Sequence, residues 1–415
     1  MLVLALKSLW ARRLTAGLTL MAIAISVLLL LGVEKVRVEL KDSFSRTLSG
    51  TDLIVGARTG QINLLLYSVF RLGNPTNNIS WDSYQRISKQ PGIAWTIPVA
   101  LGDSHQGFRV LGTNQDYFKH YAYGHQQALQ LAQGRAFNNT FEAVIGADVA
   151  RTLGYQLNDP LIIAHGAGNT SFSLHDDLPF TLVGILAPTG TPVDKTVHVR
   201  LDGLEAIHLG WETGRKTLNL SAEQAKEQDL TPKSITAFLV GMHNKVQVFS
   251  LQRAINNYRA EPLSAILPAA ALHELWGLLS IAEKAIAFIA VFVVVAGLLG
   301  MLTTLLAGLS ARRRELAILR ALGAGPRHLF SLLILEALLL TALGISLGLA
   351  LLYGAQLSLA PWLQAQHGLL LTLGWPSMSE WRLIGLTLLA GTVMGMLPAL
   401  RAYFYSLHDG MSIDH

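Results

Sequence analysis

The chain contains thirteen histidines and no cysteine, so the histidines are the main candidates for metal binding or acid–base chemistry. Without cysteine there can be no disulfide, no thiol nucleophile and no cysteine-based metal site. Five histidines in the central part of the chain come under consideration: His105, His120, His125, His165 and His175. None of the five stands three or four residues from another, the spacing that places two ligands on one helix face. We therefore expect solvated loop histidines and no metal site.

Motifs for catalysis and nucleotide hydrolysis are missing from the sequence. No G-x-x-x-x-G-K-[ST] phosphate loop occurs, since the glycines in residues 56–60 are not followed by the required lysine. His273 and Glu274 lack the second histidine of a zinc-protease helix, and no serine stands in a G-x-S-x-G turn. We expect no catalytic residue, no cofactor bound by this chain, and no ATP hydrolysis by this chain alone.

A basic amphipathic segment, Arg-Arg-Arg-Glu-Leu-Ala-Ile-Leu-Arg-Ala-Leu-Gly-Ala, occupies residues 312–324 between two long apolar runs. Leu316, Leu319 and Leu322 recur every three residues, and charged side chains take the positions between them. Gly323 then ends the turn. This pattern predicts a helix of about three turns that is too polar to enter lipid. Such a helix lies along the membrane surface and can receive a push from the aqueous phase.

The composition identifies the elements around this segment. Hydrophobic residues make up 51% of the 415 residues, charged residues only 14%, and the mean hydropathy is +0.40, as in a membrane protein. Long uncharged runs occur at residues 14–33, 285–309, 329–352 and 383–400. Each approaches or exceeds the roughly 20 residues with which a helix crosses about 30 Å of hydrocarbon. We expect four spans, with residues 34–274 forming a large domain outside the membrane.

The first apolar run could also be a secretory signal peptide, since Lys7, Arg12 and Arg13 precede it. Its length of about 20 residues exceeds the roughly 7 to 15 residues of a signal core. No small-x-small cleavage site precedes Glu34. We interpret this run as an uncleaved membrane anchor.

Lysine and arginine near the ends of the spans predict the orientation of the chain. With four spans, the N-terminal tail, the connection between the second and third spans, and the C-terminal tail share one side. These three segments carry Lys7, Arg12, Arg13, Arg312, Arg313, Arg314, Arg320, Arg327 and Arg401. We therefore place them in the cytoplasm and the large domain outside. Topology and anionic lipid also explain the net charge of +5, so we expect membrane lipid as a partner and no nucleic acid.

Glu336 lies inside the third apolar run. An intramembrane carboxylate is costly and is by default a functional candidate. Two interpretations remain open for it: pairing with a neighbouring span, or a position near the cytoplasmic interface.

Residues 60–73 of the large domain are unusually apolar for a helix that faces solvent. In one interpretation they form a surface for a hydrophobic substrate or an outer partner, and in the other they form a buried core helix. The side chains that would form the surface are Leu64, Leu65, Leu66, Tyr67 and Phe70.

The large domain has mixed α and β patterning. Short β-branched or alternating runs predict strands at residues 51–56, 143–145, 160–164, 180–186, 196–200 and 235–240. Helices are expected at residues 81–89, 146–154, 201–209 and 245–257. Ser80 or Asp82 would cap the first of these helices, and Asp202 the third. Residues 165–178 and 213–231 are polar and are expected to be surface loops.

The segment at residues 312–324 resembles the signature between the second and third spans of the MacB/FtsX-type (LolC/E-like, type VII) ABC transporter permease family. Pro-Ala-Leu-Arg-Ala at residues 398–402 is similar to that family's exit from the last span. Ser-Leu-Trp-Ala-Arg-Arg at residues 8–13 is similar to its entry helix. The order of one span, a large domain and three further spans also matches. The resemblance covers the whole membrane part of the chain.

The resemblance implies a permease that works as a dimer, with a second copy or a paralogue, on a cytoplasmic ABC ATPase dimer that binds ATP and Mg²⁺. Residues 312–324 would be the coupling helix that docks on the ATPase. Its polar contacts or lipid anchors would be Arg312, Arg313, Arg314, Glu315 and Arg320, and its apolar face Leu316, Ile318, Leu319 and Leu322. Gly323 would allow the abrupt turn. The alternative is that the arginines only set topology and the leucines only rest on the third span.

The fold that the resemblance implies is four transmembrane helices plus a mixed α/β extracytoplasmic domain, the MacB-like periplasmic core, inserted between helices 1 and 2. The expected division is 1–36 for the N-terminal helix and first span, 37–274 for the outer domain, 275–311 for the second span, 312–324 for the coupling helix, 327–353 for the third span, 354–381 for an outer loop, 382–404 for the fourth span and 405–415 for the tail. Within the outer domain, we expect a base at 37–105 and 213–274 and an inserted lobe at 106–212.

The function that the resemblance implies is ATP-driven efflux or extraction of a lipoprotein, peptide, antibiotic or other hydrophobic compound on the outer side of a bacterial inner membrane. Two alternatives remain open. One is a transmitter that activates an extracytoplasmic hydrolase or sensor without transport, and the other is a receptor or scaffold without an ATPase. A periplasmic membrane-fusion protein, lipoprotein or hydrolase would be a further partner.

Overall fold

The computed structural model describes residues 2–124, 126–166, 177–210, 221–311, 318, 321, 323–367 and 374–405. The chain divides into two compact units. The first, called the membrane unit here, holds Met1–Glu39, Ser280–Trp362 and Leu371–His415. The second, called the outer unit, holds Leu40–Leu279 and Leu363–Leu370.

The membrane unit is helical. Its helices are α1 (Leu2–Ala11), α2 (Arg13–Arg46), α10 (Pro268–Ala311), α12 (Pro326–His367) and α13 (Met378–Tyr405). The described residues contain four helical stretches long and apolar enough to cross a membrane: Arg13–Glu39, Pro268–Leu309, Pro326–Ala360 and Met378–Phe404. The four predicted spans are therefore confirmed. The outer loop expected from residue 354 is wrong in its first part, because α12 continues to His367.

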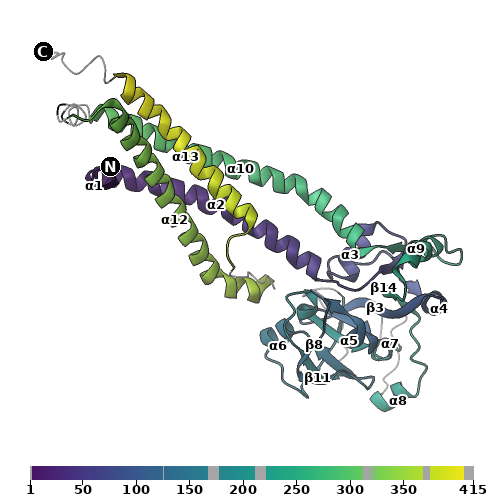
Figure 1. Ribbon diagram of the computed structural model, residues 1–415. Coiled ribbons are helices and arrows are strands. Elements are labelled where there is room, and N and C mark those ends of the chain that lie inside the picture. Colours follow the sequence, from purple (N-terminus) through teal and green to yellow (C-terminus); the bar gives the residue numbers. More distant parts are fainter. Residues whose placement is uncertain are drawn as a thin grey trace. The chain divides into compact units, whose positions relative to one another are not determined.

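Small residues bring the long helices of the membrane unit together (Figure 1). A side chain at Gly344 would meet Ile23 of α2, and one at Gly348 would meet the Ala24 carbonyl and Val27. Where helices approach this closely, hydroxyl groups also bond across the interface, and Ser26 Oγ donates to the Val293 carbonyl of α10 at 3.1 Å. Such packing and hydrogen bonds hold helices together in lipid, where burial of apolar surface does not favour association.

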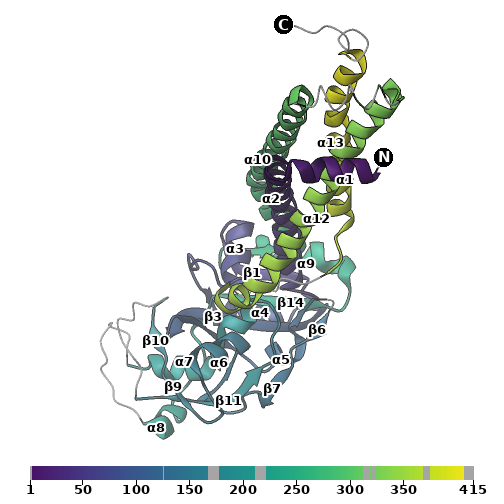
Figure 2. The ribbon, with the colours of Figure 1, turned by 90° about the vertical axis from the view of Figure 1, so that its left-hand side faces the viewer.

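The outer unit is built on one sheet, to which eleven strands of the described chain contribute. The strand order is β15-β1-β14-β3-β4-β12-β8-β11-β7, with β10 added beside β3 and β9 beside β11. Figure 2 labels β3, β14, β7 and β11 among these strands. The pairs β12–β4 and β11–β8 are parallel, and the others are antiparallel. The strands are β1 (Leu53–Ala57), β3 (Ile93–His105), β4 (Phe108–Thr113), β7 (Leu131–Gly134), β8 (Glu142–Ile145), β9 (Pro160–Leu161), β10 (Ala164–His165), β11 (Phe180–Leu186), β12 (Thr196–Arg200), β14 (Ala237–Met242) and β15 (Leu263–Ile266).

Short elements cover this sheet. Two small ladders pair β2 (Ile79–Ser80) with β13 (Ser234–Ile235) and β5 (Ala122–Tyr123) with β6 (Gln127–Ala128). The helices are α3 (Gln61–Ser68), α4 (Trp81–Ser88), α5 (Asp116–His120), α6 (Ala147–Leu153), α7 (Leu201–His208), α8 (Ala222–Lys226) and α9 (Val248–Asn256), with 3₁₀ turns η1 (Pro192–Lys195) and η2 (Lys245–Gln247). One core cluster joins strand residues from both parts of the outer domain, including Ile97 and Val144.

Most of the predicted elements of this unit are present, and the differences include the following. Ser80 caps α4 as expected, accepting a hydrogen bond from the Ser83 amide. Asp202 does not cap α7, because the N-cap position is Arg200, whose guanidinium pairs with the Asp202 carboxylate. The strand expected at residues 160–164 is two short strands, β9 and β10. Of the two expected loops, the first begins in β10 and the second contains α8.

Candidate functional site

The predicted coupling segment lies mostly outside the described residues. This applies to Arg312, Arg313, Arg314, Glu315, Leu316, Leu319, Arg320 and Leu322. Of the remaining positions, Ile318 is 56% exposed and Gly323 has a φ of 97°. A φ in that region favours glycine, as expected for the residue that ends the helix. The docking role of the segment stays a prediction.

Two hydrogen bonds from the N-terminal region reach the residues near this segment. Arg12 Nη2 donates to the Gly308 carbonyl in the last turn of α10, at 2.8 Å. Ser8 Oγ donates to Glu336 Oε1 of α12 at 3.2 Å, and the Glu336 side chain is buried. One partner of Glu336 is thus Ser8, a residue of the short helix α1.

The apolar stretch at residues 60–73 is not an exposed surface. Leu64, Leu65, Tyr67 and Phe70 are buried in the core of the outer unit, and Leu66 packs against that core from a partly buried position. The hypothesis of a substrate or partner surface at these side chains is therefore wrong. Residues 64–67 belong to a core helix, α3, and Phe70 follows the end of that helix in the same core.

A cluster that the sequence did not predict is centred on Asp103. This residue lies in β3 where the ladder with β4 shifts register between Leu101 and Ser104, so that β3 holds one extra residue. A bulge of this kind redirects side chains and is frequent beside functional sites. On the other side, Asp103 pairs in register with His165 of β10. The strand pairing therefore places both side chains together.

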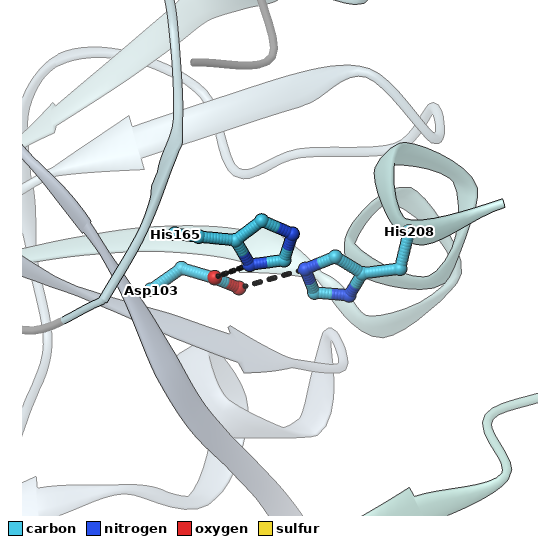
Figure 3. A group of neighbouring side chains, drawn as sticks. All are labelled: Asp103, His165 and His208. Atoms are coloured by element: carbon cyan, nitrogen blue, oxygen red, sulfur yellow. Dashed lines mark hydrogen bonds and ion pairs between the residues drawn. The ribbon is translucent and has the colours of Figure 1, made fainter. Parts of the chain in front are cut away.

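His208 completes the cluster from the last turn of α7. Both imidazole rings face the Asp103 carboxylate (Figure 3). His165 Nδ1 is 3.1 Å from Asp103 Oδ1, and His208 Nε2 is 3.3 Å from Asp103 Oδ2. The two rings stack with centroids 4.6 Å apart and an angle of 10° between their planes. One ligand atom from each of the three residues lies within 4.8 Å of the others.

The electrostatics of the cluster favour a charged carboxylate. Asp103 is 3% exposed, and burial by itself raises the pKa of its carboxyl group. The hydrogen bonds and positive charge of His165 and His208 outweigh that effect, so the pKa of Asp103 lies well below its usual range. The outer unit thus holds a buried carboxylate between two imidazoles.

The cluster opens onto a cavity of about 450 Å³. The side chains of His165 and His208 are 33% and 30% exposed, so solutes can reach both rings. Glu205, one turn before His208 on α7, lines the same cavity, as does Lys233. Burial raises the pKa of the Glu205 carboxyl group, against the opposing charges of His208 and Lys233.

The sequence does not reveal this cluster, because its three residues come from distant parts of the chain. His208 was not among the five histidines considered, although Glu205 and His208 have the three-residue spacing that places two side chains on one helix face. Asp103 and His165 are 62 residues apart, and no sequence pattern links them. The expectation that His165 is a solvated loop residue is wrong, because His165 lies in β10 and pairs with Asp103 of β3.

The remaining histidines considered in the sequence have other environments. His105 is also not a solvated residue, since it is buried and its ring nitrogens lie 2.6 Å from the Ile162 carbonyl and 3.0 Å from the Tyr155 hydroxyl. Burial lowers the pKa of His105. His120 stacks on Trp95 at 5.3 Å between ring centroids. His125 and His175 lie outside the described residues.

Two family models match the chain in an order that agrees with this architecture. The MacB-like periplasmic core domain matches residues 16–257, more than half of the chain. The FtsX-like permease C-terminal model matches residues 287–407. The first match covers α2 and most of the outer unit, and the second covers most of the described helical chain that follows.

Two curated relatives are ABC transporter proteins. The pyoverdine export ATP-binding/permease protein PvdT of Pseudomonas fluorescens is 25% identical over 281 residues, which cover 66% of this chain and 38% of the relative. The uncharacterized ABC transporter permease YknZ of Bacillus subtilis is 27% identical over 110 residues, 26% of this chain and 25% of the relative. The chain thus matches less than two fifths of the length of either relative.

Two solved structures resemble the outer part of the chain weakly. The periplasmic region of MacB from Actinobacillus actinomycetemcomitans covers 55% of this chain and 94% of its own, with 11% identity and a TM-score of 0.34. The extracellular domain of YknZ from Gram-positive bacteria covers 52% and 99%, with 13% identity and a TM-score of 0.31.

Proposed function

Because this chain belongs to the MacB/FtsX-type ABC transporter permease family, we propose that it is the permease subunit of an ATP-driven efflux or extraction complex. A separate cytoplasmic ATPase dimer binds ATP and Mg²⁺ and docks on residues 312–324. A second copy or a paralogue completes the permease pair. ATPase closure then moves the outer domain, which displaces a hydrophobic substrate outside the membrane.

The observation that carries the proposal is the unbroken course of α10. This helix runs for 44 residues from Pro268 to Ala311 and ends directly before the basic segment. At 1.5 Å per residue it is about 66 Å long, roughly twice the thickness of the hydrocarbon layer. A continuous helix carries a displacement along its axis. A push on the segment at its cytoplasmic end can therefore be felt at the start of the helix in the outer unit.

Contacts of the N-terminal region support the same mechanism. The Arg12 guanidinium bonds to the Gly308 carbonyl, where a cation also complements the negative end of the helix dipole. A side chain at Gly308 would collide with this guanidinium, so the glycine makes room for it. Arg12 directly precedes α2, so this bond ties the start of α2 to the end of α10 that leads into the proposed coupling helix. We infer that the two helices move together.

The direction of transport that we propose is outward. The word export in the name of the Pseudomonas fluorescens relative supports this direction. The load that we propose is a lipoprotein, peptide, antibiotic or similar hydrophobic compound, handled at the outer domain without a path through the bilayer. A transmitter that activates an outer hydrolase is the alternative outcome of the experiments below.

The coupling role can be tested with Leu319→Asp in the full-length protein in detergent micelles. The ATPase is the ABC ATPase subunit that co-purifies with the wild-type chain, identified by mass spectrometry and then purified separately. Loss of an apolar anchor should weaken its binding on the order of 30-fold. Leu72→Asp is the matched control, because Leu72 is a 54% exposed leucine of the outer unit. Equal affinity for wild type and Leu319→Asp would refute the coupling role, as would failure of any ATPase to co-purify.

The transport role needs the reconstituted complex in proteoliposomes. Efflux predicts that a hydrophobic peptide or lipoprotein stimulates ATP hydrolysis and leaves the membrane in an ATP-dependent manner. If ATP hydrolysis instead rises only with a purified outer hydrolase and no compound is released, the protein is a transmitter.

A further inference from the structure

We propose that Asp103, His165 and His208 form a binding site for a divalent transition metal ion of the zinc type. The site lies wholly in the outer unit and does not depend on the proposed coupling to an ATPase. It would hold the ion through two imidazole nitrogens and one carboxylate oxygen, with a further position open to the adjacent cavity.

The separations between the ligand atoms fit such an ion. Zinc bonds of about 2.0–2.2 Å in a tetrahedral arrangement place neighbouring ligand atoms roughly 3.3–3.5 Å apart. His165 Nδ1 lies 3.1 Å from Asp103 Oδ1, and His208 Nε2 lies 3.3 Å from Asp103 Oδ2. One ligand atom of each residue lies within 4.8 Å of the others, and because the two rings stack, one ring must turn for both nitrogens to face a single ion.

The types of ligand atom indicate which metal ion the site would prefer. Imidazole and carboxylate together suit zinc and its neighbours, whereas Mg²⁺ and Ca²⁺ prefer sites made of oxygen atoms alone. The buried, charged Asp103 carboxylate supplies the anion that offsets part of the ion's charge. Lys233 also lines the cavity and opposes cation binding, but Glu205 lies there too and offsets its charge.

The geometry favours an open site rather than a closed structural one. Three protein ligands with a solvent-accessible fourth position are typical of zinc sites that bind water or another molecule. The exposed parts of both rings and the 450 Å³ cavity provide that access. Glu205 or a water molecule would take the fourth position. A bound ion would also link β3, β10 and α7, which come from three distant parts of the chain.

The scaffold around the site is already in place. The bulge in β3 and the register of β10 hold Asp103 and His165, and the helix α7 holds His208. The facing nitrogens must be unprotonated to bind the metal, so the affinity for Zn²⁺ falls as the pH falls. A hydrogen-bonded triad without a metal role would bind no Zn²⁺ at any pH.

The experiment uses the full-length, tag-free protein in detergent, stripped with a chelator and titrated with Zn²⁺ alone by calorimetry and equilibrium dialysis. We expect one Zn²⁺ per chain and a loss of affinity of at least about 100-fold in each of Asp103→Asn, His165→Gln and His208→Gln. His243→Gln is the matched control, because His243 is exposed in the outer unit away from the cavity residues. A hundredfold excess of Zn²⁺ over its Kd should raise the unfolding temperature of the outer unit by about 5 °C or more.

A second measurement separates loss of the site from loss of the fold. Co²⁺ bound by two imidazoles and a carboxylate in a tetrahedral site gives intense visible absorption, which each ligand variant should lose while its circular dichroism stays that of wild type. The proposal is overturned if the stripped wild type binds no Zn²⁺, or if binding survives unchanged in all three folded variants.

Discussion

The membrane unit and the outer unit use the same apolar residue types in opposite places. On α10, Phe288 and Phe292 are 64% and 59% exposed and pack against each other on the outside of the bundle. In the outer unit, Phe180 and Phe238 are fully buried between the sheet and its helices. Apolar surface is at no disadvantage in lipid, so the membrane unit is held by close backbone approach and hydrogen bonds, and the outer unit by burial.

The largest effect is expected from removing a buried ring of the outer unit. Phe180→Ala should destabilise this unit by about 3–5 kcal/mol, because the lost ring leaves a cavity beside Phe141, 5.7 Å away between centroids. Phe288→Ala should change stability by no more than about 0.5 kcal/mol, since Phe288 is exposed on the surface of α10. In the full chain, hydrogen exchange of β8 and β11 measures the stability lost in Phe180→Ala, and hydrogen exchange of α10 measures the change in Phe288→Ala. Equal losses of stability in the two variants would contradict the contrast between a unit held by burial and a unit held by close helix packing.

The next effect tests close helix packing in the membrane unit. Gly348→Leu should cost about 1–3 kcal/mol, because the new side chain meets the Ala24 carbonyl and Val27 of α2. Gly354→Leu on the same helix is the control, since no atom lies within 4 Å of the position its Cβ would take. Unfolding of the full chain in mixed micelles, followed by protection of α2 and α12, gives both values. A larger cost for Gly354→Leu would contradict the packing described.

A smaller effect is expected at the best paired carboxylate of the outer unit. Glu142 accepts two bonds from Arg135, at 2.7 and 2.6 Å, and further bonds from the Asn138 and Asn139 amides. Glu142→Gln should cost about 1–2 kcal/mol, because an amide offers fewer acceptors to these donors. Thermal unfolding of the outer unit, followed by hydrogen exchange, measures the loss at neutral pH.

The pH dependence of the same pair has a definite sign. Hydrogen bonding to Arg135 holds the pKa of Glu142 well below its usual range, in opposition to burial. A carboxyl group whose pKa is lower in the folded protein contributes stability above its unfolded pKa and loses that contribution as the pH falls through the folded value. Wild type should therefore lose more stability than Glu142→Gln on acidification. A constant difference between the two at every pH would show that ionisation of Glu142 is not involved.

The smallest effect is expected for the polar pair of the membrane unit. A double-mutant cycle with Ser8→Ala and Glu336→Gln should give a coupling energy of about 0.6 kcal/mol, the average for hydrogen bonds between membrane helices. Unfolding in mixed micelles measures all four proteins of the cycle. A coupling energy larger than the measured cost of Glu142→Gln would reverse the ranking of polar contacts in the two units.

The two units also differ in how many of their helices and strands the sequence predicts. The four spans follow from long runs of apolar residues. Each run can be recognised in the sequence without knowledge of tertiary contacts. In the outer unit, β11 and β12 were predicted because their β-branched runs end at clear boundaries. The hairpin of β3 and β4 was missed, because Pro98 and Gly102 interrupt β3 and its turn uses Gln106 with Gly107 instead of asparagine with glycine.

The sequence by itself determined the membrane class, the four spans, the inserted α/β domain and the resemblance to the permease family. These properties depend on composition and periodicity along the chain, which local physics converts into helices and strands. Only the tertiary structure decided that Leu64, Leu65 and Tyr67 of α3 are buried in the core and that Asp103 meets His165 and His208. Both outcomes depend on strand register and on a single bulge, and those are set by contacts between residues that are far apart in the sequence.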